Sequence, residues 1–277
     1  IYCLDIKLKY NKILKMENNK KIINQLVSLA YKAGKEIMTL YQKSLEIELK
    51  KDNSPVTEAD KLSDIIITSE LAKNFPEIKC ISEESYQKEE KGILGRNFFL
   101  IDPLDGTKEF IKKNDEFTVN IALVENNKSK LGIIYAPAKE RLFFNIDRDK
   151  SYEIKTNILE EEINLNSSKK ISVSKNKTDL TAVISRSHDN EMTRNFLKNY
   201  NIKNTIICGS SLKFCLIASG EADIYPRLGP TKEWDIAAGH AILEASGGKV
   251  ITLDDKKVIY GNKDQDYFNP EFIASNF

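Results

Sequence analysis

The sequence predicts an α/β fold with an α+β N-terminal half and an α/β C-terminal half. In the first half, two stretches with the apolar periodicity of helices are followed by a series of apolar strands. In the second half, strands and helices alternate along the chain, as they do in α/β units. The 277 residues, 41% hydrophobic and 30% charged, are enough for one large domain or two smaller ones with real cores.

The first half is expected to begin with an amphipathic helix over residues 20–42, where apolar residues recur at helical spacing. Residues 45–49 alternate and suggest a short edge strand or hairpin arm. After the turn residues 52–55, Thr57 and Asp60 fit a capping box that opens a second helix. Apolar runs then predict strands at 78–81, 98–101, 117–124, 130–137 and 140–146.

Residues 147–170 are polar, charged and rich in Asn and Ser, which makes them the best candidate for a domain junction. We therefore expect an N-terminal domain over 16–150 and a C-terminal domain over 168–277. Residues 1–15 are expected to be a non-native or disordered extension before Met16, and a basic amphipathic tether is the alternative. The second half is expected to contain strands at 180–185, 204–208, 222–226, 249–253 and 271–274 and helices at 191–200, 212–219 and 236–245.

The bulk composition excludes several classes of protein. The formal net charge of +1 gives no global field that would favour nucleic acid or an anionic membrane. No apolar run approaches the roughly 20 residues that a membrane-spanning helix needs. The four cysteines show neither a CxxC pair nor a disulfide framework, so a reducing compartment is expected. With only two histidines, a His-based metal site or a Ser-His-Asp triad is poorly supported.

The stretch Asp102–Pro103–Leu104–Asp105–Gly106–Thr107 follows the buried run Phe98–Ile101, so two aspartates stand where a core strand ends and a tight turn begins. Two carboxylates, a backbone carbonyl between them and a hydroxyl just after offer an all-oxygen cradle for a hard cation such as Mg2+. Asp-Pro and Asp-Gly are also common turn dipeptides, and this stretch alone does not decide between the two interpretations.

Other acidic residues stand in similar places, at the end of a strand or the start of a helix. With Asp102 and Asp105, the side chains of Asp60, Glu83 and Asp235 could surround two or three divalent ions that clamp a phosphate. Glu83 and Thr107 form a natural pair to take a proton from water, and backbone N–H groups at Gly106 and Thr107 could meet phosphate oxygens. Helix capping by Asp60, and surface charge at Glu83, are equally ordinary explanations.

The second half supplies candidate anion-binding groups. Ser210 and Ser211 precede a helix, Lys213 lies one turn inside it, Arg227 follows a strand, and His188 lies in a loop. Each also has a plain explanation, because serines cap helices, most lysines and arginines are solvated, and a loop histidine is usually just exposed.

Three motifs, at residues 102–107, 83–84 and 234–239, together resemble the inositol monophosphatase superfamily of lithium-sensitive, Mg2+-dependent phosphatases. The match is closer still to the CysQ-type 3'(2'),5'-bisphosphate nucleotidases, and it covers the chain from about residue 20 to the end. The resemblance implies a layered α-β-α-β-α sandwich of the sugar-phosphatase type, with the site between the two halves. The further stretches that carry it are 52–60, 102–123, 185–188, 209–218 and 225–231.

The same resemblance implies roles for individual residues. It implies two or three Mg2+ ions, held by Glu83, Asp102, the Leu104 carbonyl, Asp105 and Asp235, with Asp60 supporting a further metal or its water. Thr107 with Glu83 would activate the nucleophilic water. The residues expected to hold adenine and the phosphate that is not cleaved are His188, Ser210, Lys213 and Arg227, with further substrate contacts from Gly106, Thr107, Ser211 and Asp235.

The function that the resemblance implies is hydrolysis of adenosine 3',5'-bisphosphate to AMP and phosphate, with the sulfated nucleotide 3'-phosphoadenosine 5'-phosphosulfate as a further substrate, in the setting of sulfate assimilation. An inositol or sugar monophosphatase of the same superfamily is the alternative, and a non-catalytic metal or nucleotide sensor is a remote one. We expect a small-molecule nucleotide bisphosphate as partner, no nucleic acid, a monomer or homodimer, and a cytoplasmic protein with at most peripheral membrane association.

Overall fold

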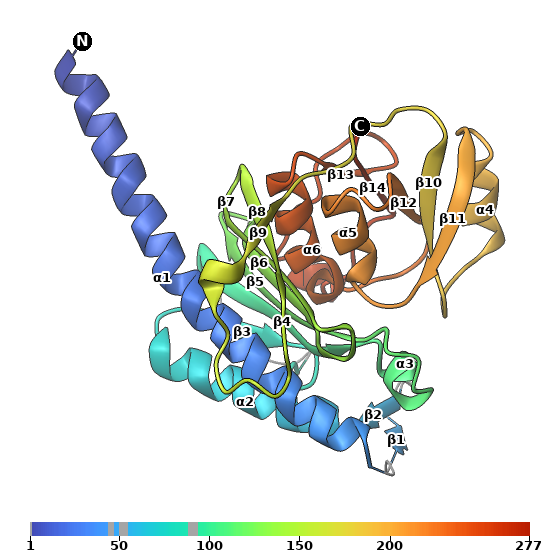
Figure 1. Ribbon diagram of the computed structural model, residues 1–277, viewed down its shortest axis with the longest axis horizontal. Helices are drawn as coiled ribbons and strands as arrows, with labels where there is room; N and C mark the ends of the chain where they lie inside the picture. The colour runs from blue at the N-terminus through green and yellow to red at the C-terminus, as the bar shows by residue number, and fades with distance from the viewer. Residues whose placement is uncertain (1, 44–46, 50–54, 88–93) are drawn as a thin grey trace.

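The computed structural model describes residues 2–43, 47–49, 55–87 and 94–277 (Figure 1). Its first sheet has seven strands in the order β3-β4-β5-β6-β7-β8-β9. β3 (Lys79–Ser82) runs parallel to β4 (Asn97–Asp105), and every later pair in the sheet is antiparallel. The other strands of this sheet are β5 (Thr118–Glu125), β6 (Lys128–Ala136), β7 (Arg141–Asp147), β8 (Lys150–Lys155) and β9 (Lys169–Ile171).

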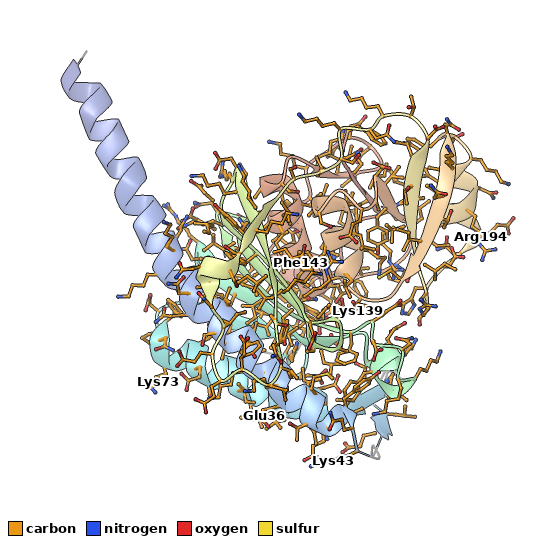
Figure 2. The ribbon with its side chains drawn as sticks, viewed as in Figure 1. Glu36, Lys43, Lys73, Lys139, Phe143 and Arg194 are labelled. Carbon is orange, nitrogen blue, oxygen red and sulfur yellow. The ribbon has the colours of Figure 1, made fainter. Side chains whose placement is uncertain are left out.

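Helices cover both faces of the first sheet, which explains why its strands are continuous apolar runs in the sequence. Along β4, Phe99 packs with α1 (Tyr2–Tyr41) and α2 (Glu58–Asn74), while Phe98 packs with α5 (Leu212–Ala218) and α6 (Glu233–Ala245). Alternate side chains point to opposite faces of a strand, so both faces of β4 lie in a core. Figure 2 shows Phe143 of β7, which is fully buried, in the core between this sheet and the second half.

The second sheet has five strands in the order β11-β10-β12-β14-β13. α5 and α6 lie between the two sheets. α4 (Glu191–Leu197) packs on the outer face of the second sheet, where its Leu197 lies in one apolar cluster with Ala182 and Ile224 of the sheet. The layers are therefore α-β-α-β-α, which confirms the predicted fold. The strands of this sheet are β10 (Leu180–Ser185), β11 (Ile202–Cys208), β12 (Ile224–Arg227), β13 (Lys249–Thr252) and β14 (Phe272–Ser275).

The remaining elements are short. β1 (Ile47–Leu49) pairs with β2 (Pro55–Thr57), which confirms a hairpin arm near its expected place, whereas the expected turn at residues 52–54 lies outside the described residues. Three 3-10 turns occur in the described chain, η1 (Pro137–Lys139), η2 (Leu165–Ser167) and η3 (Lys263–Gln265). No helix of the described residues is long and apolar enough to cross a membrane.

Two boundaries differ most from those expected. The first helix was expected from residue 20, but α1 begins at Tyr2, and Figure 1 shows its first turns projecting away from the rest of the chain. The polar stretch 147–170 was expected to be a junction, but it contains β8 and the start of β9, so the first sheet extends to Ile171. The division into domains at 16–150 and 168–277 stays a prediction.

α6 lies in close contact with the first sheet. A Cβ atom on Gly132 of β6 would lie 2.2 Å from the backbone oxygen of Ala238, so only glycine permits this approach. The hydroxyls of Ser129 and Ser151 donate to carbonyl oxygens of α6, each at 2.6 Å. These contacts fix the start of α6, which carries Asp235, against the sheet that carries the other acidic residues.

Candidate active site

The chain turns sharply at the end of β4, as the sequence predicted. The pairing of β4 with β5 shifts register between Asp102 and Asp105, and Gly106 then adopts a left-handed conformation with φ of 91°. A Cβ atom at Gly106 would lie 3.0 Å from the Glu116 carbonyl oxygen, so a larger residue would be strained and crowded. α3 (Thr107–Ile111) begins directly afterwards, and the turn places both aspartates at the edge of one cavity.

Three carboxylates meet at this edge. Glu83 follows β3, Asp102 lies in β4, and Asp235 lies in the first turn of α6, and each offers one oxygen within 4.8 Å of the others. Asp105 lines the same cavity, and its Oδ2 accepts the Ser211 N–H at 2.6 Å. Clustered oxygen donors of this kind are the ligands that Mg2+ prefers.

The electrostatics of this cluster favour a cation. Burial is the largest cause that raises the pKa of both Asp105 and Asp235. For Asp235, the negative charges of Asp105 and Glu83 raise the pKa further. A divalent cation would relieve this repulsion, so the donor set fits a metal site.

Asp60 takes part in the capping box of α2 and also contacts Thr107 at the cavity wall. Its Oδ2 accepts the Thr57 N–H at 2.7 Å and the Thr57 hydroxyl at 2.6 Å, which confirms the capping box. Its Oδ1 accepts the Thr107 hydroxyl at 2.8 Å. The structure therefore gives Thr107 a different carboxylate partner from Glu83, with which the sequence had paired it.

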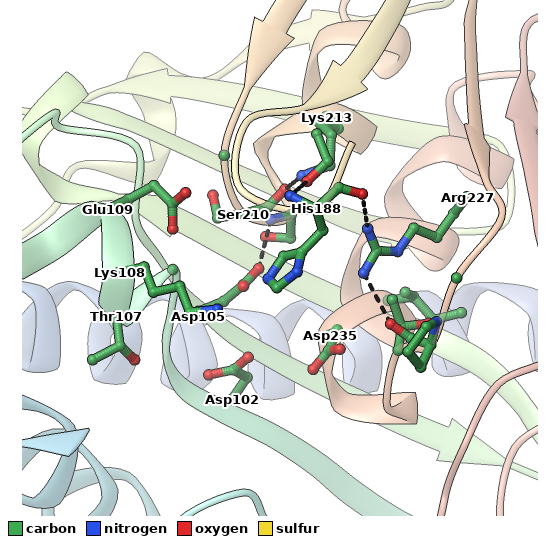
Figure 3. Close-up of a pocket in the computed structure, with 18 of the residues that line it drawn as sticks. Asp102, Asp105, Thr107, Lys108, Glu109, His188, Ser210, Lys213, Arg227 and Asp235 are labelled. Carbon is green, nitrogen blue, oxygen red and sulfur yellow. Dashed lines mark hydrogen bonds between the residues drawn. The ribbon is translucent and has the colours of Figure 1, made fainter. Parts of the chain in front are cut away.

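A cavity of about 450 Å³ lies between the two halves of the chain (Figure 3). Asp60 is the one expected site residue that does not line it, and it reaches the cavity wall through Thr107. Figure 3 shows Asp102 and Asp235 on one side and Lys213 and Arg227 on the other. The expected residues that line the cavity are Glu83, Asp102, Leu104, Asp105, Gly106, Thr107, His188, Ser210, Ser211, Lys213, Arg227 and Asp235.

Two buried cations stand opposite the acidic cluster. Lys213 is 5% exposed and donates to the carbonyl oxygens of Cys208, at 3.4 Å, and Ser210. Arg227 is 9% exposed and donates to the carbonyl oxygens of His188, at 3.3 Å, and Pro230, at 2.9 Å. In the described part of the chain, neither cation forms an ion pair with a carboxylate. Buried charges are costly unless they are paired, so these two favour an anionic ligand.

His188 and the two serines have different surroundings. Partial burial lowers the pKa of His188, and the positive charges of Arg227 and Lys108 lower it further, so the ring is neutral near pH 7. Ser210 lines the cavity in a left-handed conformation with φ of 49°. The hydroxyl of Ser211 is bonded to Asn120, at 2.7 Å, and Thr118, at 2.8 Å, so it supports the wall rather than facing a ligand.

The lining residues that the sequence interpretation missed include Lys108 and Glu109. Both directly follow Thr107 in the sequence, and this position could have indicated that they lie at the site. The buried Glu116 and Asn120 were also missed, since both lie in or beside a predicted strand and carry no motif of their own. They reach the site through Gly209 and through Ser211, respectively.

The family model of the inositol monophosphatase family matches residues 18–276, and the chain belongs to this family. Within the family, the chain is similar to proteins named 3'(2'),5'-bisphosphate nucleotidase CysQ. The one from Buchnera aphidicola is 44% identical over 92% of this chain and 94% of its own. The one from Escherichia coli K12 is 39% identical over 92% of this chain and 99% of its own.

Solved structures agree with this assignment. The crystal structure of CysQ from Bacteroides thetaiotaomicron, a bacterial member of the family, is 36% identical and superposes with a TM-score of 0.78, covering 95% of this chain and 98% of its own. An inositol monophosphatase/NADP phosphatase complexed with Mg2+ and phosphate has a TM-score of 0.73 over 94% of this chain and 91% of its own, at 21% identity, which supports the fold alone.

Proposed function

We propose that this protein is a Mg2+-dependent phosphatase that hydrolyses adenosine 3',5'-bisphosphate to AMP and phosphate. The observation that carries the proposal is the opposite charge of the two sides of one cavity. The carboxylates of Glu83, Asp102 and Asp235 lie within 4.8 Å of one another on one side, and buried Lys213 and Arg227 lie on the other. A substrate with two phosphates matches both sides of the cavity. The CysQ relatives described above are named 3'(2'),5'-bisphosphate nucleotidases, which also supports a substrate of this kind.

The acidic side is suited to hold two or three Mg2+ ions. Glu83, Asp102, Asp105 and Asp235 would supply carboxylate oxygens, and Leu104 would supply its carbonyl oxygen. When bound, the ions neutralise phosphate charge and lower the pKa of water. The clustered carboxylate oxygens of Glu83, Asp102 and Asp235 support this choice of metal.

Thr107 and Asp60 are placed to handle the proton of the attacking water. The Thr107 hydroxyl donates to Asp60 Oδ1, so the lone pairs of its oxygen stay available for a water in the cavity. Asp60 is held by Thr57 and is fully buried, so its orientation is fixed before substrate arrives. In this scheme the water donates to Thr107 Oγ1 while Thr107 donates to Asp60, which serves as the proton acceptor.

On the opposite side, Lys213 and Arg227 would hold the phosphate that is not cleaved, and His188 and Ser210 would contact the nucleoside. The carbonyl oxygens that both cations now contact keep their side chains in place. We also expect the pocket to take 3'-phosphoadenosine 5'-phosphosulfate, because its 5'-phosphosulfate group is an anion of similar charge to a 5'-phosphate.

The test is phosphate release by the purified protein with Mg2+. We expect adenosine 3',5'-bisphosphate to be hydrolysed with a higher kcat/KM than inositol 1-phosphate, and expect EDTA to abolish release and lithium to inhibit it. A preference for inositol 1-phosphate would overturn the nucleotide specificity and favour the monophosphatase alternative. Binding of the nucleotide without phosphate release, by both the native protein and the Asp102→Asn variant, would favour a sensor.

A further inference from the structure

The segment formed by α3 and the loop before β5 carries two buried glutamates that reach across to the second half of the chain. Glu109 is 4% exposed and Glu116 is 8% exposed, although each stands in a polar, charged stretch of sequence. This segment begins at Thr107, in the acidic side of the cavity. A buried carboxylate normally has a specific partner, so the partners of these two residues are informative.

Glu116 binds two separate turns of the second half. Its carboxylate accepts two hydrogen bonds from Arg186, from Nε at 2.6 Å and from Nη2 at 2.8 Å. Its Oε2 also accepts the Gly209 N–H at 2.8 Å. Arg186 follows β10 and Gly209 follows β11, so one carboxylate ties together the ends of two neighbouring strands. Bidentate pairs of arginine and carboxylate are directional as well as strong.

Glu109 adds a second contact to the same turns. It accepts a hydrogen bond from the hydroxyl of Ser187, the residue next to Arg186. A Cβ atom on Gly209 would lie 2.7 Å from Cγ of Glu109 and 2.9 Å from the Glu116 carbonyl oxygen. Gly209 therefore permits the close approach of the two segments, and a larger residue there would push them apart.

The two turns held in this way carry the groups assigned to the nucleotide. His188 follows Ser187, Ser210 follows Gly209, and Lys213 lies one turn further into α5. Building on the function proposed above, we infer that the contacts of Glu116 with Arg186 and Gly209, and of Glu109 with Ser187, position the nucleotide pocket relative to the metal site. Glu109, Glu116 and Arg186 are positioning residues, because they set the span between the reacting phosphate and the second one.

The test compares Glu116→Gln with a matched control, Glu221→Gln. Glu221 also forms a bidentate pair between the two halves, with Arg141 at 2.5 and 3.2 Å, but neither residue lines the cavity. In Glu116→Gln we expect KM for adenosine 3',5'-bisphosphate to rise about tenfold, while kcat and the Mg2+ concentration for half-maximal rate change less than about twofold. Glu221→Gln should lower the thermal unfolding midpoint without changing KM.

Two further variants separate positioning from general destabilisation. Arg186→Met should raise KM as Glu116→Gln does, and the double variant should show no further rise, because the two residues act through one contact. Ser187→Ala leaves the ion pair intact and should raise KM by a smaller factor, which keeps the test valid if Glu116→Gln fails to fold.

The outcomes are distinct. Three results would overturn the positioning role. The first is an unchanged KM in these variants, and the second is a fall in kcat or in Mg2+ affinity as large as the rise in KM. The third is the same rise in KM in Glu221→Gln. If the unaltered protein releases no phosphate from the bisphosphate nucleotide, the proposed function fails and the positioning role fails with it. If the unaltered protein is active and the variants match it, only the positioning role fails.

Discussion

Thr107 donates its hydroxyl hydrogen to Asp60 at 2.8 Å, across 47 positions of sequence. The other oxygen of Asp60 accepts the backbone N–H and the hydroxyl of Thr57, the residue that caps α2. One carboxylate therefore completes a helix cap and orients a hydroxyl at the candidate metal site. The helix cap that the sequence offered for Asp60 is therefore confirmed, and its role beside a metal ion stays a prediction.

Replacing Thr107 with Val should remove catalysis while leaving the fold in place. Val has nearly the same shape but no hydroxyl, so the water that Thr107 would contact loses its hydrogen-bond partner. We expect kcat to fall by about 100-fold or more, with little change in KM. Kinetics together with the thermal unfolding midpoint would check this, and full turnover by Thr107→Val would rule out the proposed role of the hydroxyl.

Asp60→Asn gives an independent check on the same pair. The amide oxygen of asparagine can still accept the Thr57 N–H in the capping box, so α2 should keep its start, but a neutral amide is a far poorer proton acceptor. We expect kcat to fall as in Thr107→Val, with an unfolding midpoint within a few degrees of the unaltered protein. A large loss of stability without a separate loss of kcat would mean that Asp60 serves the cap alone.

Replacing Asp235 with Asn should stabilise the metal-free protein. Burial raises the pKa of Asp235, and the charges of Asp105 and Glu83 raise it further, so ionised Asp235 is unfavourable without a cation. In EDTA, we expect the unfolding midpoint of Asp235→Asn to lie above that of the unaltered protein, and we expect the stabilisation by Mg2+ to shrink and turnover to disappear.

Asp223 provides the matched control for this experiment. It is also buried, but its carboxylate accepts the Thr181 N–H at 2.8 Å and a bond from Asn276 at 2.7 Å. Asp223→Asn should therefore lower the midpoint with or without Mg2+, because a satisfied buried carboxylate is lost. A fall in the metal-free midpoint of Asp235→Asn, similar to that of Asp223→Asn, would contradict the idea of a crowded acidic cluster.

Lys213 should determine affinity for the second phosphate. In Lys213→Met the apolar stem is kept and the charge is lost, so we expect KM for adenosine 3',5'-bisphosphate to rise by about tenfold or more. Lys203→Met is the control, since Lys203 is largely exposed and lies 3.6 Å from Asp179. Steady-state kinetics on both variants would check this, and equal KM values would remove Lys213 from the nucleotide pocket.

The ion pairs of Arg141 should contribute to stability in a pH-dependent way. Burial raises the pKa of Glu153 and of Glu221, but the hydrogen bonds and the charge of Arg141 outweigh it, so both pKa values lie below 4.5 in the folded chain. The unfolded chain therefore binds more protons than the folded chain in this range. The stability from these carboxylates is present above pH 4.5 and is lost as the pH falls through their folded pKa values.

Urea unfolding between pH 7 and pH 3 would test this, with Arg141→Met beside the unaltered protein. The variant should be less stable at pH 7 and should lose less stability on acidification, so the two curves converge at low pH. Glu221 is 44% exposed, so solvent screening keeps its share small. Parallel curves over the whole range would show that these pairs do not carry the pH dependence.

Much of the fold could be predicted from the sequence because its signals are local. β10 occupies the predicted residues 180–185, since a buried strand between turn residues has a clear pattern. β8 and β9 were missed because they lie beside and at the edge of the first sheet, where lysines and a partly buried glutamate interrupt the apolar alternation. The length of α1 before residue 20 was also missed, since the predicted helix was limited to the amphipathic stretch.

The site was predicted as a set of residues, but not as a set of contacts. Acidic residues at strand ends, such as Asp102, gave a usable signal because strand ends meet at one edge of a sheet. The bond between Thr107 and Asp60 depends on how α2 packs beside β4, which no local pattern records. Glu116 was missed for a related reason, because a charged residue in a polar stretch is ordinarily solvated.

The close contact of Gly132 with Ala238 has a consequence for the history of this protein family. It fixes α6, and with it Asp235, to the sheet that carries the other metal-binding candidates. The groups assigned to the nucleotide lie instead on α5, at the end of β12 and in the turns after β10 and β11. Substitutions in those turns could therefore redirect the enzyme to a new phosphate ester while the hydrolytic apparatus is inherited unchanged.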